Sequence, residues 1–172
     1  MDIRLARMDD CYTIAKINYD NWRKTYKDIL PDEFLNHLDI EQMRKEYAEF
    51  LSDNKKKILV ALDEKDEILG FASFELDLEE DNCIYLASLH VKANARGKGI
   101  GTSLLLEVGG FGLNNHYKKM SICILKGNEN ARTLYVKLGA EHYKDFEDCF
   151  HGIKTESEKL LWNDLTIFKN YF

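Results

Sequence analysis

Two hydrophobic periodicities alternate along the chain. The opening DIRLARM alternates apolar and polar positions, which predicts a short strand. Apolar residues at helical spacing follow from Ile14 to Trp22. Pro31 starts a second helical stretch, and IEQMRKEYAEFL predicts a further helix near 40–52. The first part of the chain is therefore predicted to be a strand followed by helices.

Strand patterns separated by polar turns occupy the middle of the chain. ILVAL (58–62) and ILGFASFEL (68–76) flank the polar turn DEKDE, which predicts a β-hairpin. The largely apolar run CIYLASLHV (83–91) is typical of a strand buried on both faces. MSICIL (120–125) predicts another strand, and KLLWNDLTIF (159–168) a final one.

Two helical patterns lie between these later strands. The first contains TSLLLEV, and the second, NENARTLYVKLG, ends at Gly139, a residue suited to the position after a helix. The order is roughly β-α-α-β-β-β-α-β-α-β-β, which predicts an α/β (α+β) fold with a mixed sheet. The segment 144–159 is longer than a tight hairpin needs, so we expect it to cover the active site or to form a homodimer contact. His142 and His151 show no partner pattern and are expected to be ordinary surface or packing residues.

Composition narrows the class of protein. A chain of 172 residues suits one domain with a sizeable core, and we expect a single domain over 1–172. The net charge of −6 argues against nucleic-acid binding, which needs clustered Lys and Arg, and weakly favours a cationic small substrate. The opening residues have no signal-peptide pattern, and no apolar run approaches the roughly 20 residues of a membrane span. We therefore expect a cytoplasmic protein with no membrane partner.

The cysteines give no sign of a metal site. Cys11, Cys83, Cys123 and Cys149 form no CxxC pair and have no metal-ligand spacing. Isolated cysteines in a reducing compartment are mostly small buried hydrophobic residues, which is the interpretation we adopt.

A cluster of glycines follows the buried strand. Gly97, Gly99 and Gly101 lie between this strand and a helix, where glycine permits positive φ and the helix offers unpaired N–H groups to a phosphate. Arg96 and Lys98 add positive charge. The spacing matches neither the nucleotide pattern GxxxxGK[ST] nor the dinucleotide pattern GxGxxG.

A second glycine cluster falls inside the following helix. Gly109, Gly110 and Gly112 each cost about 1 kcal/mol there relative to alanine. We expect a weakened, kinked or closely packed turn at this point, without a ligand role.

Two motifs carry a family resemblance. LHVKANARGKGIGTSLL resembles the acetyl-coenzyme A loop of the GNAT superfamily of N-acetyltransferases, with RxxGxG filled by Arg96, Gly99 and Gly101. The second family signature, N-x-x-A-x-x-x-Y-x-x-x-G, is filled by Asn128, Ala131, Tyr135 and Gly139. Both motifs fall on their predicted elements, and the resemblance covers roughly 57–145 best, with further likeness in the first strand and in NWRKTYKDILPDEFL.

The resemblance implies the fold and the cofactor. It implies a mixed, largely antiparallel twisted sheet of about six to seven strands with about four flanking helices. It also implies acetyl-CoA as cosubstrate and no metal. The amides of 97–102 would cradle the pyrophosphate, 89–91 would pair with the pantetheine arm, and an N–H near Val91 would polarise the thioester carbonyl. The implied cofactor-binding residues are Leu89, His90, Val91, Arg96, Gly97, Lys98, Gly99, Ile100, Gly101, Thr102, Asn128, Ala131 and Tyr135.

Tyr135 is the candidate general acid. A thiol has a solution pKa near 8.5 and tyrosine one near 10, so a tyrosine holds its proton at neutral pH and can donate it to the departing sulfur. The alternative is that Tyr135 is simply a packed aromatic residue. The base is open, because Tyr85 stands where many family members have a strand glutamate. His90 could act, Glu75 or Asp77 could act through water, or the amine could enter already neutral.

The acceptor side is least defined. Trp22, Tyr26 and Phe34 are candidates for lining it, as is Tyr85, although helix packing explains the first three equally well. The acidic run ELDLEED (75–81) is either a solvated loop or an electrostatic collector for a polycationic amine.

These features together predict an N-acetyltransferase. The expected reaction is direct transfer from acetyl-CoA to a small amine or polyamine in a ternary complex, because no cysteine lies near the second motif as a covalent carrier. A protein or peptide N-terminus is the rival acceptor. A catalytically silent CoA-binding regulatory module is the alternative of a different class; the missing glutamate favours it, and the presence of Asn128 and Tyr135 argues against it.

Overall fold

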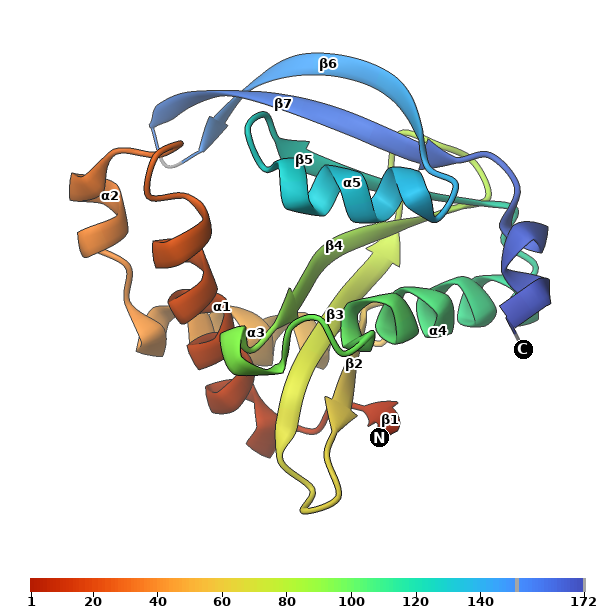
Figure 1. Cartoon of the computed structure of the whole chain (residues 1–172), viewed down its shortest axis with the longest axis horizontal. Helices are drawn as coiled ribbons and strands as arrows, with labels where there is room; N and C mark the ends of the chain where they lie inside the picture. Colours follow the sequence, from red (N-terminus) through yellow and green to blue (C-terminus); the bar gives the residue numbers. More distant parts are fainter. Residues whose placement is uncertain (151, 172) are drawn as a thin grey trace. The chain divides into compact units, whose positions relative to one another are not determined.

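The computed structural model describes residues 1–150 and 152–171, so His151 lies outside the described residues. Within them, seven strands form a mixed sheet in the order β1-β2-β3-β4-β5-β7-β6 (Figure 1). The chain divides into two compact units: unit 1 comprises Met1–Glu75 and Ser88–Val108, and unit 2 comprises Leu76–Ala87 and Gly109–Phe172. None of the described helices is both long and apolar enough to span a bilayer.

Unit 1 contains the first strands and helices. Its β1 pairs antiparallel with β2, and β2 with β3. Three elements begin in one unit and end in the other: β3, whose last residue Leu76 belongs to unit 2, β4 (Cys83–Val91) and α4 (Ile100–Asn114). The remaining bounds are β1 (Asp2–Leu5), α1 (Cys11–Thr25), α2 (Asp32–Asn36), α3 (Ile40–Ser52), β2 (Lys57–Leu62) and β3 (Ile68–Leu76).

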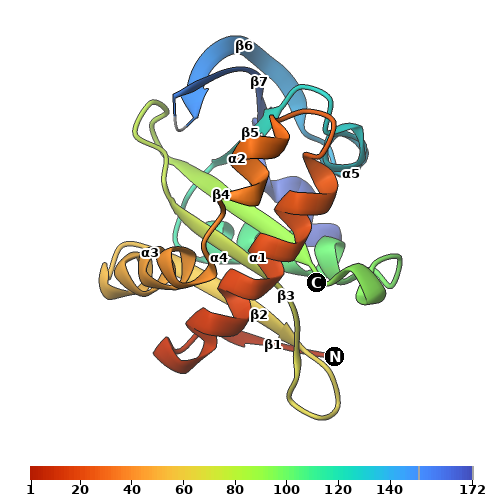
Figure 2. The same cartoon turned by 90° about the vertical axis from the view of Figure 1, so that its left-hand side faces the viewer.

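The core of unit 1 lies between α1, α3 and the sheet. Figure 2 shows α1 and α3 on the same side of β2 and β3. Ile14 and Ile17 of α1 are three residues apart and therefore share a helix face. Alternate side chains of a strand point to the same face, and Ile14 and Ile17 pack on one such face of β2. They also pack on the start of β3. The strand members of this cluster are Ile58, Val60, Leu62, Ile68 and Phe71.

Unit 2 is built on the later strands. The start of β4 pairs parallel with β5, whereas β5–β7 and β6–β7 are antiparallel. The bounds are β5 (Lys119–Leu125), α5 (Glu129–Lys137), β6 (Glu141–Phe150) and β7 (Ile153–Trp162). Gly139 follows α5 with a φ of 93°, which confirms the predicted left-handed position after this helix.

The structure refines three sequence predictions about elements. All three helical segments expected before β2 are present, so the summary order with two helices there omits one of them. The segment 144–159 forms most of the paired β6–β7 hairpin, and its expected role in covering the active site or in a homodimer contact stays a prediction. The predicted last strand ends at Trp162, and a 3₁₀ helix (Leu165–Tyr171) follows. Leu165 and Phe168 are fully buried and three residues apart, so the 3₁₀ period places both on one side.

This 3₁₀ helix explains two of the three glycines in the second cluster. A Cβ on Gly109 would collide with the ring of Phe168, and a Cβ on Gly112 would lie 2.6 Å from Leu165 Cδ1. Helix α4 nevertheless runs unbroken to Asn114. Of the three outcomes expected at these glycines, close packing is the one that the structure confirms.

Candidate active site

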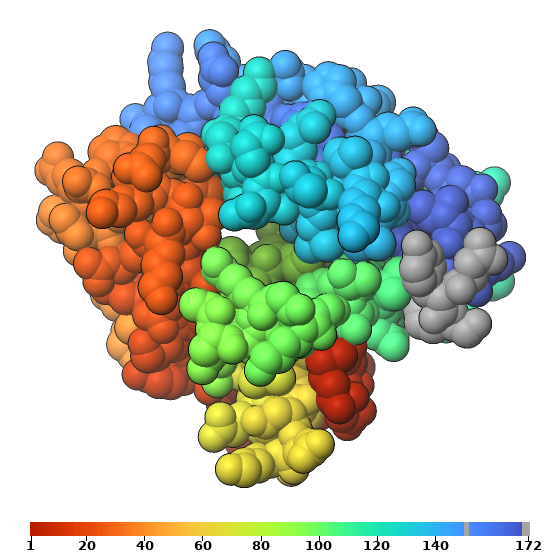
Figure 3. All heavy atoms as spheres, viewed as in Figure 1, coloured from red at the N-terminus to blue at the C-terminus, as the bar shows by residue number. Residues whose placement is uncertain are grey.

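The first motif forms an exposed loop before α4. Gly97 and Gly99 have φ values of 76° and 79°, and a Cβ on either would meet no atom within 4 Å. Glycine is thus needed here for its backbone conformation rather than for space. Figure 3 shows the segment 92–100, in green, on the surface. The exposed amides next to the start of a 15-residue helix suit a phosphate group.

Asn21 of α1 holds this loop through hydrogen bonds to Val91 and Arg96. Its Nδ2 donates to the carbonyl of Val91 at 3.0 Å, and its Oδ1 accepts from Arg96 Nη2 at 2.6 Å. Arg96 Nε also donates to the Val91 carbonyl, at 3.4 Å. Asn21 is 2% exposed, and the sequence analysis missed it because no motif includes it. Since a carbonyl accepts two hydrogen bonds, Val91 can offer a ligand only its N–H.

The end of β4 is closely packed against β3. A Cβ on Gly70 would lie 2.7 Å from the carbonyl oxygen of His90, so only glycine fits at this point of β3. The His90 ring packs on Phe71, with 5.4 Å between ring centroids. Burial, helped by the charge of Arg96, lowers the pKa of His90 to about 4. His90 is therefore neutral at pH 7 and too weak a base to compete for an ammonium proton.

The second motif forms helix α5 in unit 2. Asn128 caps the helix, with its Oδ1 accepting from the Ala131 N–H at 3.4 Å. Tyr135 is 4% exposed, and its ring meets Trp162 edge to face at 5.8 Å. Trp162 Nε1 donates to the carbonyl of Leu138 at 2.9 Å. Asn128 thus has a structural role that the resemblance did not imply.

Tyr85 lies on β4 opposite Ser121 of β5. Its hydroxyl forms a hydrogen bond with the thiol of Cys123. This bond lowers the pKa of the thiol, but burial raises that pKa by more. Burial also raises the pKa of Cys83, to about 12. Neither thiol is activated as a nucleophile. The expectation of buried cysteines is confirmed for Cys11 and Cys83, whereas Cys123 is half-buried and Cys149 is exposed.

The acidic run is neutralised by lysines. Asp77 Oδ2 lies 2.9 Å from Lys159 Nζ, with side-chain exposures of only 4% and 3%. Glu79 pairs with Lys144 and Lys159, each at 3.0 Å, and Glu80 pairs with Lys119 at 3.3 Å. The solvated-loop interpretation fits Glu79, whose side chain is 62% exposed, but not the buried Asp77. The collector interpretation stays a prediction, and all three carboxylates already pair with lysines. Sequence patterns could not find the lysines because they lie on β5, β6 and β7.

These pairs also bear on the choice of base. Burial opposes ionisation of Asp77, but hydrogen bonds from Lys159 and Ser121 outweigh it and lower the pKa. A carboxylate with a lowered pKa is a poor proton acceptor. Glu75 is occupied as well, because its carboxylate lies 2.9 Å from Lys56 Nζ.

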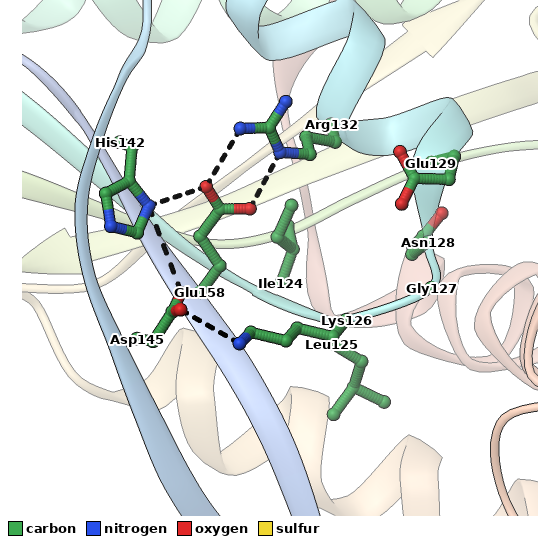
Figure 4. Close-up of a pocket in the computed structure, with 10 residues that line it drawn as sticks. All are labelled: Ile124, Leu125, Lys126, Gly127, Asn128, Glu129, Arg132, His142, Asp145 and Glu158. Carbon is green, nitrogen blue, oxygen red and sulfur yellow. Dashed lines mark hydrogen bonds and ion pairs between the residues drawn. The ribbon is translucent and has the colours of Figure 1, made fainter.

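A pocket of about 350 Å³ opens beside the start of α5 (Figure 4). Glu158 of β7 points into a cluster with Arg132 of α5 and His142 of β6. His142 is a surface residue, as expected, but its Nδ1 lies 2.8 Å from Glu158 Oε1, a partner that no sequence pattern showed. The register of β6 on β7, invisible to local patterns, creates this contact. The lining residues are Ile124, Leu125, Lys126, Gly127, Asn128, Glu129, Arg132, His142, Asp145 and Glu158.

The aromatic residues of α1 and α2 contact one another. Trp22 meets Tyr26 at 5.0 Å and Phe34 at 6.3 Å between centroids. Packing is thus part of their role. On the same helix, Asn18 Oδ1 is buried with no hydrogen-bond partner among the described residues. A buried acceptor of this kind is rare.

Comparison with known sequences identifies the family. The sequence profile of the Acetyltransferase (GNAT) family matches residues 19–140. The chain belongs to the GNAT acetyltransferase family. It is 28% identical to the uncharacterized N-acetyltransferase YuaI of Bacillus subtilis, over 97% of this chain and 95% of that protein. It is 31% identical to the thialysine N-epsilon-acetyltransferase of Bos taurus, over 53% of each chain.

Solved GNAT structures share the fold. A ribosomal-protein-alanine N-acetyltransferase from Brucella melitensis aligns with a TM-score of 0.74 and 24% identity, over 95% of this chain and 99% of the other. The PaiA N-acetyltransferase of Thermoplasma acidophilum, solved in complex with coenzyme A, gives 0.70 and 20%, over 92% and 98%. A chimera of the Vibrio cholerae spermidine N-acetyltransferase SpeG with hSSAT gives 0.73 and 14%, over 99% of both chains. GNAT enzymes use acetyl-CoA, and this chain is a GNAT N-acetyltransferase.

Proposed function

We propose that this GNAT enzyme transfers the acetyl group of acetyl-CoA directly to a small primary amine in a ternary complex, and that it forms one functional domain over 1–172. The observation that carries the proposal is the loop at Gly97 and Gly99, whose left-handed backbone turns exposed amides toward solvent at the start of α4. When bound there, acetyl-CoA supplies an activated acetyl thioester.

The residues of the first motif fit a pyrophosphate. The amides of 97–102 bind its oxygens, helped by the positive end of the α4 dipole. Lys98 is exposed and adds charge at the loop. Arg96 contributes mainly by tying the loop to Asn21. The N–H of Val91 remains the candidate donor to the thioester carbonyl.

Tyr135 acts as the general acid of this proposal. As the amine nitrogen bonds to the carbonyl carbon and the C–S bond breaks, the Tyr135 hydroxyl gives its proton to the departing sulfur. The nitrogen loses one proton to solvent, and the Tyr135 oxygen regains one from solvent, so the enzyme returns to its starting state. The packing of Tyr135 on Trp162 orients the ring, so the structural and catalytic interpretations are compatible.

No covalent acetyl-enzyme is needed. Cys123 precedes the second motif on β5, but burial raises the pKa of its thiol and Tyr85 hydrogen-bonds it. A protonated thiol is a poor nucleophile, which supports direct attack by the amine. With Tyr85 in place of a carboxylate, and with His90 neutral, we propose that the amine enters in its neutral form.

The acceptor class rests on weaker similarity. Two of the similar proteins are named for thialysine and for spermidine, which both carry primary amines. Asp77 and Glu79 of the acidic run already pair with lysines, so this run gives no reason to prefer a polycation over other small amines as the acceptor.

An acceptor panel tests the proposal. Purified enzyme and acetyl-CoA are incubated with alkylamines, polyamines, amino acids, aminoglycosides and N-terminal peptides, and free thiol release is followed. We expect release with at least one small amine. Turnover of peptides alone would replace the small-amine acceptor with a protein N-terminus. Normal acetyl-CoA binding with an intact thioester for every amine would overturn the proposed reaction.

A further inference from the structure

Helix α5 is tied to β7 by one buried carboxylate. Arg132 Nε donates to Glu158 Oε2 at 2.9 Å, and Arg132 Nη2 donates to Glu158 Oε1 at 3.2 Å. This is a two-bond contact between a planar guanidinium and a carboxylate, which fixes orientation as well as distance (Figure 4). His142 of β6 contacts the same Oε1 at 2.8 Å, so Glu158 joins three elements.

The position of Arg132 within α5 gives this contact its importance. Arg132 follows Asn128 by four residues and precedes Tyr135 by three. It therefore lies on the same side of the helix as these two residues. Helix α5 has nine residues, and helices this short are unstable without tertiary contacts. The orientation of the second motif therefore depends on the tertiary contacts of α5. The Arg132–Glu158 pair is one of these contacts, and it lies between Asn128 and Tyr135 along the helix.

Burial makes the contact hard to replace. The Glu158 side chain is 8% exposed, whereas that of Arg132 is 42% exposed. Hydrogen bonds from Arg132, assisted by His142, lower the pKa of Glu158, so it stays ionised at neutral pH. Removing one partner of a buried pair leaves the other charge uncompensated, while replacing both with apolar groups is often tolerated.

We propose that Glu158 is a positioning residue, which through Arg132 holds α5 in the orientation that acetyl transfer requires. The proposal rests on the proposed function, because it assigns Glu158 an effect on a reaction that the second motif serves. Glu158 is not assigned any contact with substrate or coenzyme. Its role is to keep Asn128 and Tyr135 in place.

The main test compares Glu158→Gln with the wild type. Misplacing a reacting group by about 1 Å can cost on the order of 100-fold in rate, so we expect kcat to fall roughly 10- to 100-fold. The KM for acetyl-CoA should change by less than about threefold, because the glycine loop of the first motif is untouched. Amide hydrogen exchange of α5 should become faster, while that of β5 should not.

A double variant separates positioning from stability. In Arg132→Met/Glu158→Leu the buried carboxylate and its partly exposed partner charge are both gone, so thermal stability should recover toward that of the wild type. The two-bond geometry is also gone, so kcat should stay low. Recovery of both Tm and kcat would show that the pair serves stability alone, and would overturn the proposal.

The chain offers a matched control. Arg44 and Glu41 form another Arg–Glu pair at 2.8 Å, but on the exposed surface of α3. Glu41→Gln should leave kcat, KM and α5 exchange unchanged, since exposed pairs contribute little. A kcat of Glu158→Gln within about twofold of this control would contradict positioning. If the wild type acetylates none of the amines, the proposed function fails; α5 exchange in Glu158→Gln then decides whether Glu158 holds the helix.

Discussion

The guanidinium of Arg96 lies 2.6 Å from the Oδ1 of Asn21, which is 75 positions earlier in the chain. The same amide donates to the Val91 carbonyl, so one buried side chain joins the end of β4 and the start of the glycine loop to α1. A residue outside both family motifs thus shapes the first of them.

Asn21→Leu should therefore weaken coenzyme binding. The leucine fills similar space but provides neither hydrogen bond, so the loop loses its preorganised shape. We expect the KM for acetyl-CoA, and the Kd of CoA by calorimetry, to rise about tenfold, which corresponds to about 1.4 kcal/mol. Asp20→Asn, in an exposed pair with Lys16 on the same helix, is the control. Unchanged CoA affinity in Asn21→Leu would refute the role of this contact.

Tyr135→Phe isolates the proposed general acid. The ring and its contact with Trp162 are retained, so Tm should remain close to that of the wild type. Loss of the proton donor should lower kcat about 100-fold, within the usual range for general acid catalysis, with little change in KM. Steady-state kinetics with the best amine of the panel checks this, and a turnover near that of the wild type would contradict the assignment.

The pH dependence should follow the substrate rather than the enzyme. An alkylamine has a pKa near 10.4, so its neutral fraction rises about tenfold per pH unit between roughly pH 7 and 9. We expect kcat/KM to rise with the same slope. Because the pKa of His90 is lowered to about 4, no inflection should occur near pH 6.5, and His90→Gln should keep the profile. An inflection near neutrality that His90→Gln abolishes would identify His90 as the base after all.

The Asp77–Lys159 pair should make stability sensitive to acid. The pKa of Asp77 is lower in the folded state, so its contribution is complete above the unfolded value near 4 and is lost as the pH falls through the folded value. Asp77→Asn should lower the free energy of unfolding at pH 7 by about 3 kcal/mol, the size expected for a broken buried pair. Urea titrations from pH 7 to 3 should show a flatter acid limb for the variant. Parallel curves would exclude this linkage.

Gly109 should tolerate no side chain. In most helices a Gly→Ala change adds stability, but here the new Cβ would collide with Phe168. We expect Gly109→Ala to lower the free energy of unfolding by about 1–3 kcal/mol, as overpacking does. In the double variant Gly109→Ala/Phe168→Leu, the leucine is smaller than the phenylalanine ring and should offset part of this loss of stability. Chemical denaturation of the four proteins gives the coupling energy, and additive effects would contradict the packing explanation.

The sequence by itself determined the parts that depend on neighbouring residues. The β2–β3 hairpin, β4, β5 and α5 follow from hydrophobic period, and Gly97, Gly99 and Gly139 occupy the left-handed positions for which only local backbone conformation matters. The two motifs likewise indicated the GNAT family, because their spacing is measured along the chain.

Only the tertiary structure decided the contacts that join distant segments. It placed Asn21 beside Arg96, the lysine of β7 beside Asp77, and Glu158 beside Arg132. It also ended the expected last strand at Trp162 and made its second half part of a 3₁₀ helix that packs on Gly109. The physical reason is the same in each case: burial and strand register choose these partners, and neither is encoded in the pattern of adjacent residues.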